Sequence, residues 1–206
     1  MKKTVIVNIP MTAPVQNIVY VSDDASLPAS KRAVGYPVIS LLEEIMQPED
    51  EVKIVLIAKT SKYSMCEQRI EEFKQQMEAA NDKAGAKLIY EVLYSDFSES
   101  RDVHEQLMAA IVEHIDPDAE VITDITYGPK DLPIVVFAAL NFAERFLNCK
   151  IEHIIYGLGI FNEEGKLEDT KICDLSPLYA LSGLTNKIKC DSPEKAKEIL
   201  NSIISL

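Results

Sequence analysis

The sequence has few residues that could hold a metal ion, and they are widely spaced. Its four cysteines form no CxxC pair, and its three histidines are equally dispersed. Structural zinc sites usually take closely spaced pairs of these residues. We therefore predict no metal site, and we expect the cysteines to stay reduced and mostly buried.

Long apolar runs and an excess of basic residues are also absent. No run reaches the roughly 18 to 20 apolar residues that a membrane helix needs, and we expect no signal peptide. Lysine and arginine number 21 against 33 acidic residues, for a formal net charge of −12. Binding of long DNA or RNA requires a broad basic surface, so this charge disfavours such a partner but permits a small anion in a local pocket. We predict a cytoplasmic protein without a membrane partner.

The common nucleotide-binding signatures are missing as well. The sequence contains neither the GxGxxG turn of a dinucleotide site nor the GxxxxGK[ST] pattern of a P-loop. The chemistry of those two motifs is therefore not indicated, and we predict no cofactor.

The chain does contain an alternation of apolar strands and helical patterns. Strands are expected at 3–9, 52–58, 87–94, 119–123 and 151–160, with helices at 36–46, from 64 onward, at 103–115 and at 131–147. Continuous apolar strands separated by helices indicate a parallel sheet covered on both faces. The predicted fold class is α/β, a Rossmann-like, doubly wound, mainly parallel sheet with helices on both faces. We expect at least five strands, with the strand around Ile122 in the interior.

Local signals add detail to this prediction. Residues 64–67 have the pattern of a capping box, and residues 17–22 could form a short strand or hairpin arm. After residue 160, NEEGKLED predicts a hairpin turn and TKICDL a returning strand, followed by short helices at 177–184 and 193–204. The last helix is amphipathic and either packs on the domain, which is the favoured interpretation, or joins it to a further domain.

Polar residues follow the predicted strands where each one ends. They occur at 8–12, at 59–61, at 95–98 and at 124–130, the last with the sequence DITYGPK. Ligands of such sheets bind beyond the carboxyl ends of the strands, and the helix beginning near Asp131 could offer free backbone N–H groups to an anion. Alternatively, these are ordinary loop residues, with Asp131 as a helix N-cap and Gly128 at a turn that needs a positive φ. The residues alone leave both interpretations open.

Three segments resemble the CRISPR-associated Rossmann-fold (CARF) family. DITYGPKDLPIVVFAALNF is similar to that family's Asp-x-Thr-His-Gly motif and the helix after it, with Tyr127 in place of the histidine. IIYGLGIF and CDLSPLYALSGLTNKI are similar to its later segments and come in the expected order. The resemblance runs from about Lys3 to Lys189. It implies a CARF-like domain at 1–190 and a C-terminal helix at 191–206.

The resemblance implies a homodimeric sensor of cyclic oligoadenylate, with cyclic tetra-adenylate as the first candidate, in type III CRISPR antiviral signalling. The ligand would lie across the dimer twofold, and the effector would be a domain or protein outside this chain. The positions carried over from the family motifs are Asn8, Pro10, Met11, Thr12, Thr126, Tyr127, Gly128 and Lys130. The strand-end argument adds Lys59, Thr60, Ser61 and Asp124. Two copies of Lys130 and Lys59 could offset the phosphate charges of the ring.

Two other functions stay open. One is a stand-alone, metal-independent ring nuclease, in which a ribose 2′-hydroxyl attacks its own neighbouring phosphate. The other is a transcriptional or scaffold protein that uses the fold for another ligand. No catalytic residue is predicted, because no residue stands out as a general base and the Arg-x4-6-His pattern of the family's RNases is missing. The sensor is therefore favoured, with the apolar helix at 132–146 expected at the dimer interface.

Overall fold

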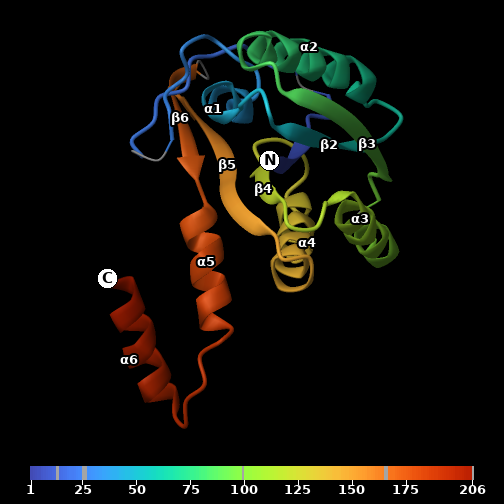
Figure 1. Ribbon diagram of the computed structural model, residues 1–206. Helices are drawn as coiled ribbons and strands as arrows, with labels where there is room; N and C mark the ends of the chain where they lie inside the picture. The colour runs from blue at the N-terminus through green and yellow to red at the C-terminus, as the bar shows by residue number, and fades with distance from the viewer. Residues whose placement is uncertain (13, 25–26, 99, 165–166, 206) are drawn as a thin grey trace.

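The computed structural model describes residues 1–12, 14–24, 27–98, 100–164 and 167–205. It contains a six-stranded sheet in the order β3-β2-β1-β4-β5-β6 (Figure 1). The strands are β1 (Lys2–Ile9), β2 (Glu51–Thr60), β3 (Lys87–Asp96), β4 (Glu120–Asp124), β5 (Lys150–Phe161) and β6 (Leu167–Asp174). All neighbours run parallel except β5 and β6, which form an antiparallel hairpin. The prediction of a doubly wound, mainly parallel sheet with Ile122 on an interior strand is confirmed.

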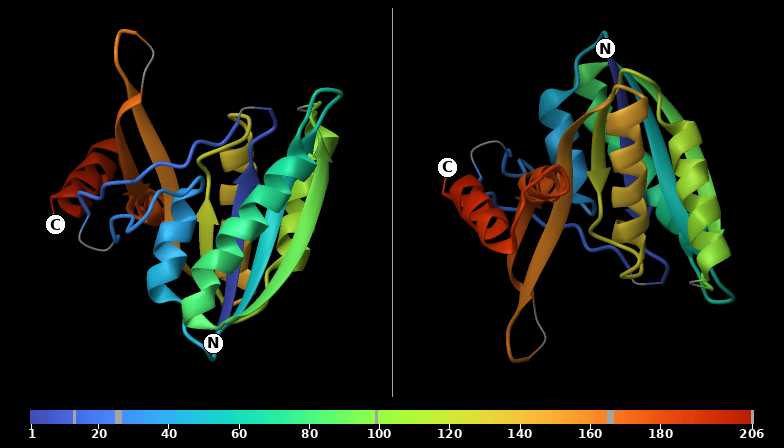
Figure 2. Two further views of the ribbon diagram at one scale, coloured as in Figure 1. Left: turned by 90° about the horizontal axis from the view of Figure 1, so that it is seen from above. Right: turned by 90° about the horizontal axis from the view of Figure 1, so that it is seen from below.

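Helices cover both faces of the sheet (Figure 2). On one face lie α1 (Pro37–Ile45) and α2 (Cys66–Ala84), and on the other lie α3 (Arg101–His114) and α4 (Leu132–Phe146). Alternate side chains of a strand point to opposite faces, so Val5 and Val7 pack in the first core and Ile6 in the second. Strands buried on both sides must be apolar at every position, which explains their continuous apolar runs.

Two local predictions are wrong. Ser64 does not cap α2, because the helix begins after Met65 without a side-chain cap and the Ser64 hydroxyl donates to the Ser61 carbonyl instead. Residues 17–22 do not form a strand of the sheet. Within the described part of that segment, only single bridges form, from Ile18 to Val34 and from Val21 to Lys171. In the second place, the backbone bonds to other segments instead, as from the Val21 N–H to the Thr170 carbonyl.

The chain ends in two helices that extend away from the sheet, α5 (Ser176–Thr185) and α6 (Pro193–Ile204) (Figure 1). Tyr179 attaches α5 to α4, since its ring packs edge-on against Phe137 and its hydroxyl lies 3.1 Å from Glu144 Oε2. No residue of α6 is buried. The favoured interpretation of the last helix as a packing helix therefore finds no support within the described part of one chain. None of the described helices is both long enough and apolar enough to cross a bilayer.

Asp174 anchors this C-terminal part to the sheet, and replacing it by asparagine is expected to destabilise the protein at neutral pH. Its carboxylate accepts hydrogen bonds from the Ile154 and Ser176 N–H groups and lies 2.7 Å from His153 Nδ1. Burial alone would raise the pKa of Asp174, but the hydrogen bonds from His153, Ser176 and Ile154 outweigh it and lower that pKa below its usual 3.8.

The sign of the pH dependence follows from that lowered pKa. The stabilisation is present above pH 3.8 and is lost as the pH falls through the folded-state pKa. Urea denaturation should therefore show that Asp174→Asn costs about 1 to 3 kcal/mol at pH 7. The difference from the wild type should shrink below pH 3.8. A cost that stays constant down to pH 2 would contradict this assignment.

Candidate functional site

The carboxyl edge of the sheet brings together the loops that follow β1 and β4. These strands are neighbours although they lie far apart in the sequence, and the strand order changes direction between them. Doubly wound sheets bind ligands at such a switch point. The β4 loop contacts the end of β1, because a Cβ placed on Gly128 would lie 3.7 Å from Asn8 Cβ. The predicted residues at 8–12 and 124–130 therefore flank the place where a ligand is expected.

Two predicted site residues are buried beneath this edge. Asn8 is fully buried, and both of its side-chain amide atoms lack a hydrogen-bond partner among the described residues. Lys59 is 1% exposed, and its Nζ donates to Ser95 Oγ at 3.1 Å and to the Asp96 carbonyl at 3.3 Å. A buried ammonium needs such partners to offset its lost hydration. Lys59 thus joins the ends of β2 and β3 from the inside and does not present its charge at the surface.

Asp124 is a structural carboxylate at the end of β4. Its Oδ2 accepts from the Val38 N–H at 3.1 Å, in the first turn of α1, and its Oδ1 accepts from the Thr126 N–H at 2.9 Å. Burial raises the pKa of Asp124, and the hydrogen bonds from Thr126 and Val38 offset this only in part. A helix N-terminus is a favourable place for a carboxylate. The side chain therefore connects β4 to α1, and it is fully buried.

The next two motif residues are also bonded inside the protein. Thr126 Oγ1 accepts from the Gly157 N–H at 2.9 Å, and the Tyr127 hydroxyl donates to the Gly35 carbonyl at 2.7 Å. Burial raises the pKa of Tyr127 to about 12, with a further contribution from the charge of Asp124. The Tyr127 ring packs edge-on against Tyr36, with centroids 5.5 Å apart. These side chains hold the β4–α4 loop in place and leave little for a ligand to contact.

The remaining predicted residues differ in exposure. Lys130, Thr12, Ser61 and Gly128 are exposed, Met11 and Thr60 are partly buried, and Pro10 is buried. The Met11 carbonyl accepts from the Met65 N–H at 2.6 Å, which ties the β1 loop to the start of α2. The Thr60 hydroxyl donates to the Ser95 carbonyl. Lys130 is thus the exposed cation among the predicted site residues.

Gly128 shapes the turn into α4. Its φ is +98°, and a Cβ there would come within 2.8 Å of Leu132 Cδ2, so both the backbone and the space require glycine. The turn also uses the N–H groups that were expected to be free for an anion. The Leu132 N–H donates to the Pro129 carbonyl, the Ile134 N–H donates to the Asp131 carbonyl, and Pro133 has no N–H. The first turn of α4 therefore offers fewer free N–H groups than expected, and the dipole of α4 remains favourable to an anion.

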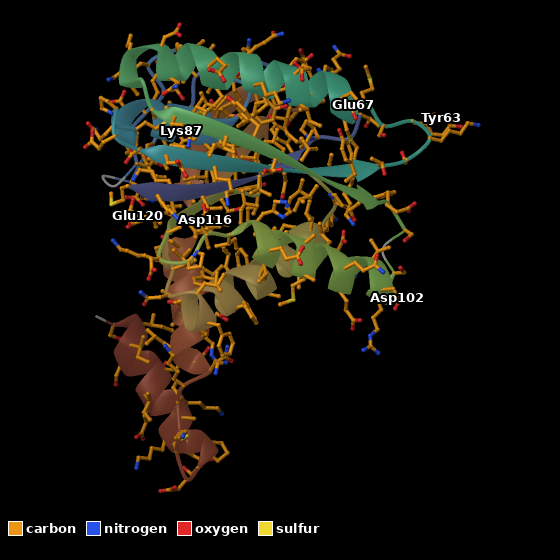
Figure 3. The ribbon with its side chains drawn as sticks, turned by 45° about the vertical axis from the view of Figure 1, so that its right-hand side comes forward. Tyr63, Glu67, Lys87, Asp102, Asp116 and Glu120 are labelled. Atoms are coloured by element: carbon orange, nitrogen blue, oxygen red, sulfur yellow. The ribbon has the colours of Figure 1, made fainter. Side chains whose placement is uncertain are left out.

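Exposed aromatic side chains lie along the β2 and β3 part of the same edge. Figure 3 shows Tyr63 extending outward from the loop between β2 and α2, where it is 75% exposed. The ammonium of Lys62 lies 5.5 Å from the centre of its ring. Tyr94 and Phe97, near the end of β3, are also exposed. Aromatic rings beside cations are suited to stacking nucleobases.

Sequence reasoning missed a histidine–aspartate pair beside this edge. His104 Nε2, on the first turns of α3, lies 2.7 Å from Asp131 Oδ2, directly before α4. Asp131 therefore does not use its side chain as an N-cap, contrary to the alternative interpretation of this loop. The two residues are 27 positions apart and form no motif. The only available signal was that each stands near the start of a helix that follows a parallel strand, and such starts share one edge of the sheet.

Comparison with known proteins gives one distant similarity. A segment of 77 residues is 29% identical to "CRISPR-associated protein MJ1674" from Methanocaldococcus jannaschii. It covers 37% of this chain and 12% of that protein, so the chain spans only a small part of that relative's length. No family model matches the sequence. The similarity supports a CRISPR-related role for the chain and does not define its family.

Replacing Thr126 by valine is expected to lower the free energy of unfolding by about 1 to 3 kcal/mol. The change keeps the shape of the side chain but leaves the Gly157 N–H without its acceptor. Urea denaturation measures the loss, with Thr12→Val as the control, because Thr12 is exposed and its replacement should cost less than about 0.5 kcal/mol. Equal stability of the two variants would contradict the structural role of Thr126.

Proposed function

We propose that this chain is a sensor of cyclic oligoadenylate in type III CRISPR antiviral signalling, with cyclic tetra-adenylate as the first ligand to test. The observation that carries the proposal is the contact of the β4 loop, in which Lys130 is exposed, with the end of β1 at the switch point of the sheet. The resemblance of DITYGPKDLPIVVFAALNF to the CARF motif falls on this loop and on α4. The distant CRISPR-associated relative supports the same context.

The charge of the site is compatible with a small cyclic anion. The protein as a whole is acidic, at −12, which disfavours a long nucleic acid but not a ring of a few phosphates. Two copies of Lys130 around a twofold would face the phosphates, and the dipole of α4 adds to the attraction. Tyr63 or Tyr94 could stack on adenine bases at the rim.

The proposal requires a dimer, and α4 offers a surface for one. Ile134 is 72% exposed and Phe146 63% exposed, and Phe142 lies exposed between them on the same helix. Six consecutive apolar residues, from Ile134 to Ala139, are more than one core-facing stripe can bury. A second copy packed against α4 would cover these side chains and place two β4 loops around one axis.

The output of the sensor would pass to an effector outside this chain. The arm formed by α5 and α6 extends away from the sheet (Figure 1). The apolar residues of α6 recur on one face, at Ala196, Ile199, Leu200, Ile203 and Ile204, and none of them is buried. Such a face requires a partner surface in the working assembly. A cytoplasmic location is part of this proposal.

The test is retention of synthetic rings by the purified protein. Cyclic tetra- and hexa-adenylate are incubated with the chain and separated on native gels, with linear tetra-adenylate as the matched control. We expect one of the rings to bind at least about 10-fold more tightly than the linear form, because a closed ring matches a twofold site without loss of chain freedom. Light scattering at tens of micromolar should give a dimer. A monomer that retains neither ring would refute the proposal.

A further inference from the structure

The two outermost strands of the sheet differ in how their free sides are covered. The chain itself covers β6, because the Val21 N–H donates to the Thr170 carbonyl and the Ile172 N–H donates to the Val21 carbonyl. β3 lies at the other end of the sheet, and no segment of the described residues pairs with its outer side (Figure 1). An open outer strand is a template for pairing with another chain. The outer side of β3 is therefore a candidate interaction surface.

The backbone of β3 is prepared for such pairing. The Lys87 N–H donates to the Asp50 carbonyl just before β2, and the Phe97 N–H donates to the Thr60 carbonyl at its end. The register between these points is continuous, so odd-numbered residues bond to β2 and even-numbered residues direct their N–H and C=O groups outward. The outward set is Leu88, Tyr90, Val92 and Tyr94. β3 is described over its whole length, and neither a proline nor a bulge, which often protect such strands, interrupts it.

A groove opens on one face of this outer strand. It measures about 450 Å³ and lies between the second half of β3 and α3. Its apolar walls are formed by Val92, Leu93, Val103, Leu107 and Ala110. Successive side chains of a strand point to opposite faces, so every second side chain of a strand added to β3 would point into this groove. Segments bound in this way gain affinity from their backbone and specificity from such pockets.

The opposite face of the outer strand, next to α2, is acidic. Glu78 Oε1 accepts from the Tyr90 hydroxyl at 3.0 Å, and a hydrogen bond with Glu67 raises the pKa of Tyr94. Both glutamates are exposed, and neither has an ion-pair partner among the described residues. Lys74, whose ammonium lies 5.7 Å from the centre of the Tyr90 ring, is already in an ion pair within α2. This face therefore favours lysine or arginine in a bound strand.

We propose that β3 and α3 form a docking site for an extended basic segment of a partner protein, which adds to the six-stranded sheet as a further strand. Apolar side chains at every second position fill the groove, and the lysines or arginines between them face Glu67 and Glu78. A second copy of this chain is a poorer occupant, because the one cation of β3, Lys87, is already paired with Glu51. Two β3 strands would mainly oppose like charges. The site goes beyond the proposed function and does not depend on it.

The test uses capped synthetic peptides of about eight residues, the length of a typical strand. Calorimetry at physiological salt should show that a peptide of alternating valine and lysine binds at least about 10-fold more tightly than one with its valines and lysines in separate blocks. Two further peptides carry N-methyl groups on every valine nitrogen or on every lysine nitrogen. One of these two should bind at least about 10-fold more weakly than the other, because alternate N–H groups of the added strand face β3.

Variants of the protein locate the binding surface. Val92→Pro removes an outward N–H that β2 does not use, and it should weaken peptide binding by about 10-fold or more. Val92→Ala keeps that N–H and should bind within about 3-fold of the wild type. Glu67→Gln should weaken binding by about 3-fold, with Glu198→Gln on the exposed surface of α6 as the matched control that leaves it unchanged. Circular dichroism melting confirms that the variants are folded.

Each contrary outcome has a definite meaning. Equal affinities for the alternating and block peptides would reduce the surface to non-specific charge and overturn the proposal. Equal affinities for the two methylated peptides, or full binding by a folded Val92→Pro protein, would also overturn it. If the wild type binds no peptide but loses self-association in the Val92→Pro variant, the surface belongs to a second copy and the proposal is wrong. Ring binding is measured separately, and its failure would refute the proposed function without affecting this site.

Discussion

Replacing Lys130 by alanine is expected to weaken the binding of cyclic tetra-adenylate by about 100-fold or more and to leave the melting temperature within about 1 °C of the wild type. Lys130 is exposed at the start of α4, where a cation is unfavourable for the helix dipole. Charge-assisted hydrogen bonds to phosphate contribute roughly 1.5 to 3 kcal/mol each, and a symmetric dimer would lose two. No ion pair of the described residues involves Lys130, so the fold should lose nothing.

The matched control for this variant is Lys87→Ala. Lys87 begins β3 at the opposite edge of the sheet, far from Tyr63 (Figure 3), and its removal changes the net charge by the same amount. Calorimetry at moderate salt should show that the Lys87→Ala protein binds the ring with an affinity close to that of the wild type. Its folding stability should fall only slightly, because the ion pair that it loses, with Glu51, is exposed. Equal affinities of the Lys130→Ala and Lys87→Ala proteins would mean that Lys130 is an ordinary solvated surface residue.

Replacing Asp124 by alanine is expected to lower the free energy of unfolding by about 3 to 5 kcal/mol. The change leaves two backbone N–H groups, those of Val38 and Thr126, without their acceptor. It also removes the carboxylate at the N-terminus of α1. Urea denaturation measures the loss. Asp102→Ala is the control, because it removes an exposed carboxylate from the first turn of α3 and should cost about 0.5 kcal/mol.

The pH dependence of Asp124 should be opposite to that of Asp174. Burial raises the pKa of Asp124 above 3.8, so its contribution to stability is largest below that pH and falls as the pH rises through the folded-state pKa. The cost of Asp124→Ala should therefore be greater at pH 4 than at pH 8, whereas the cost of Asp174→Asn should be smaller at low pH. A cost of Asp124→Ala that grows as the pH rises would contradict this assignment.

The fold could be predicted because its strands are buried on both faces. Val5, Ile6 and Val7 alternate between two cores, so the whole run must be apolar, and that pattern is readable without the structure. The position of the candidate site was predicted on the same basis, since parallel strands place their carboxyl ends at one edge. The apolar run in α4 indicated that the helix has more apolar side chains than the core can bury. In the structure, Val135 and Val136 are buried while the adjacent Ile134 is exposed.

The roles of individual site residues could not be predicted, because their partners are distant in the sequence. Thr126 is bonded to Gly157 and Tyr127 to Gly35, and neither pair has a local signature. Lys59 was expected to bind the ligand just after the strand, but β2 extends two residues past the predicted end at Ala58. Alternation along the strand after Val55 and Ile57 then directs Lys59 to the α3–α4 side of the sheet, where it is buried. A hydroxyl, a phenol or an ammonium at a strand end can bond either to the protein or to a ligand. The sequence does not distinguish these two roles, because they differ only in the hydrogen bonds that the group makes in the folded protein.

Calorimetric titration of the full chain with cyclic tetra-adenylate and cyclic hexa-adenylate tests the central proposal most directly, because it gives affinity and stoichiometry together. A sensor that binds the ring across a twofold should take one ring per two chains, and the Lys130→Ala protein should give a much weaker signal. Saturation at one ring per chain would contradict a site shared between two copies. The absence of heat from both rings at tens of micromolar, in a protein shown to be folded, would contradict the proposal as a whole.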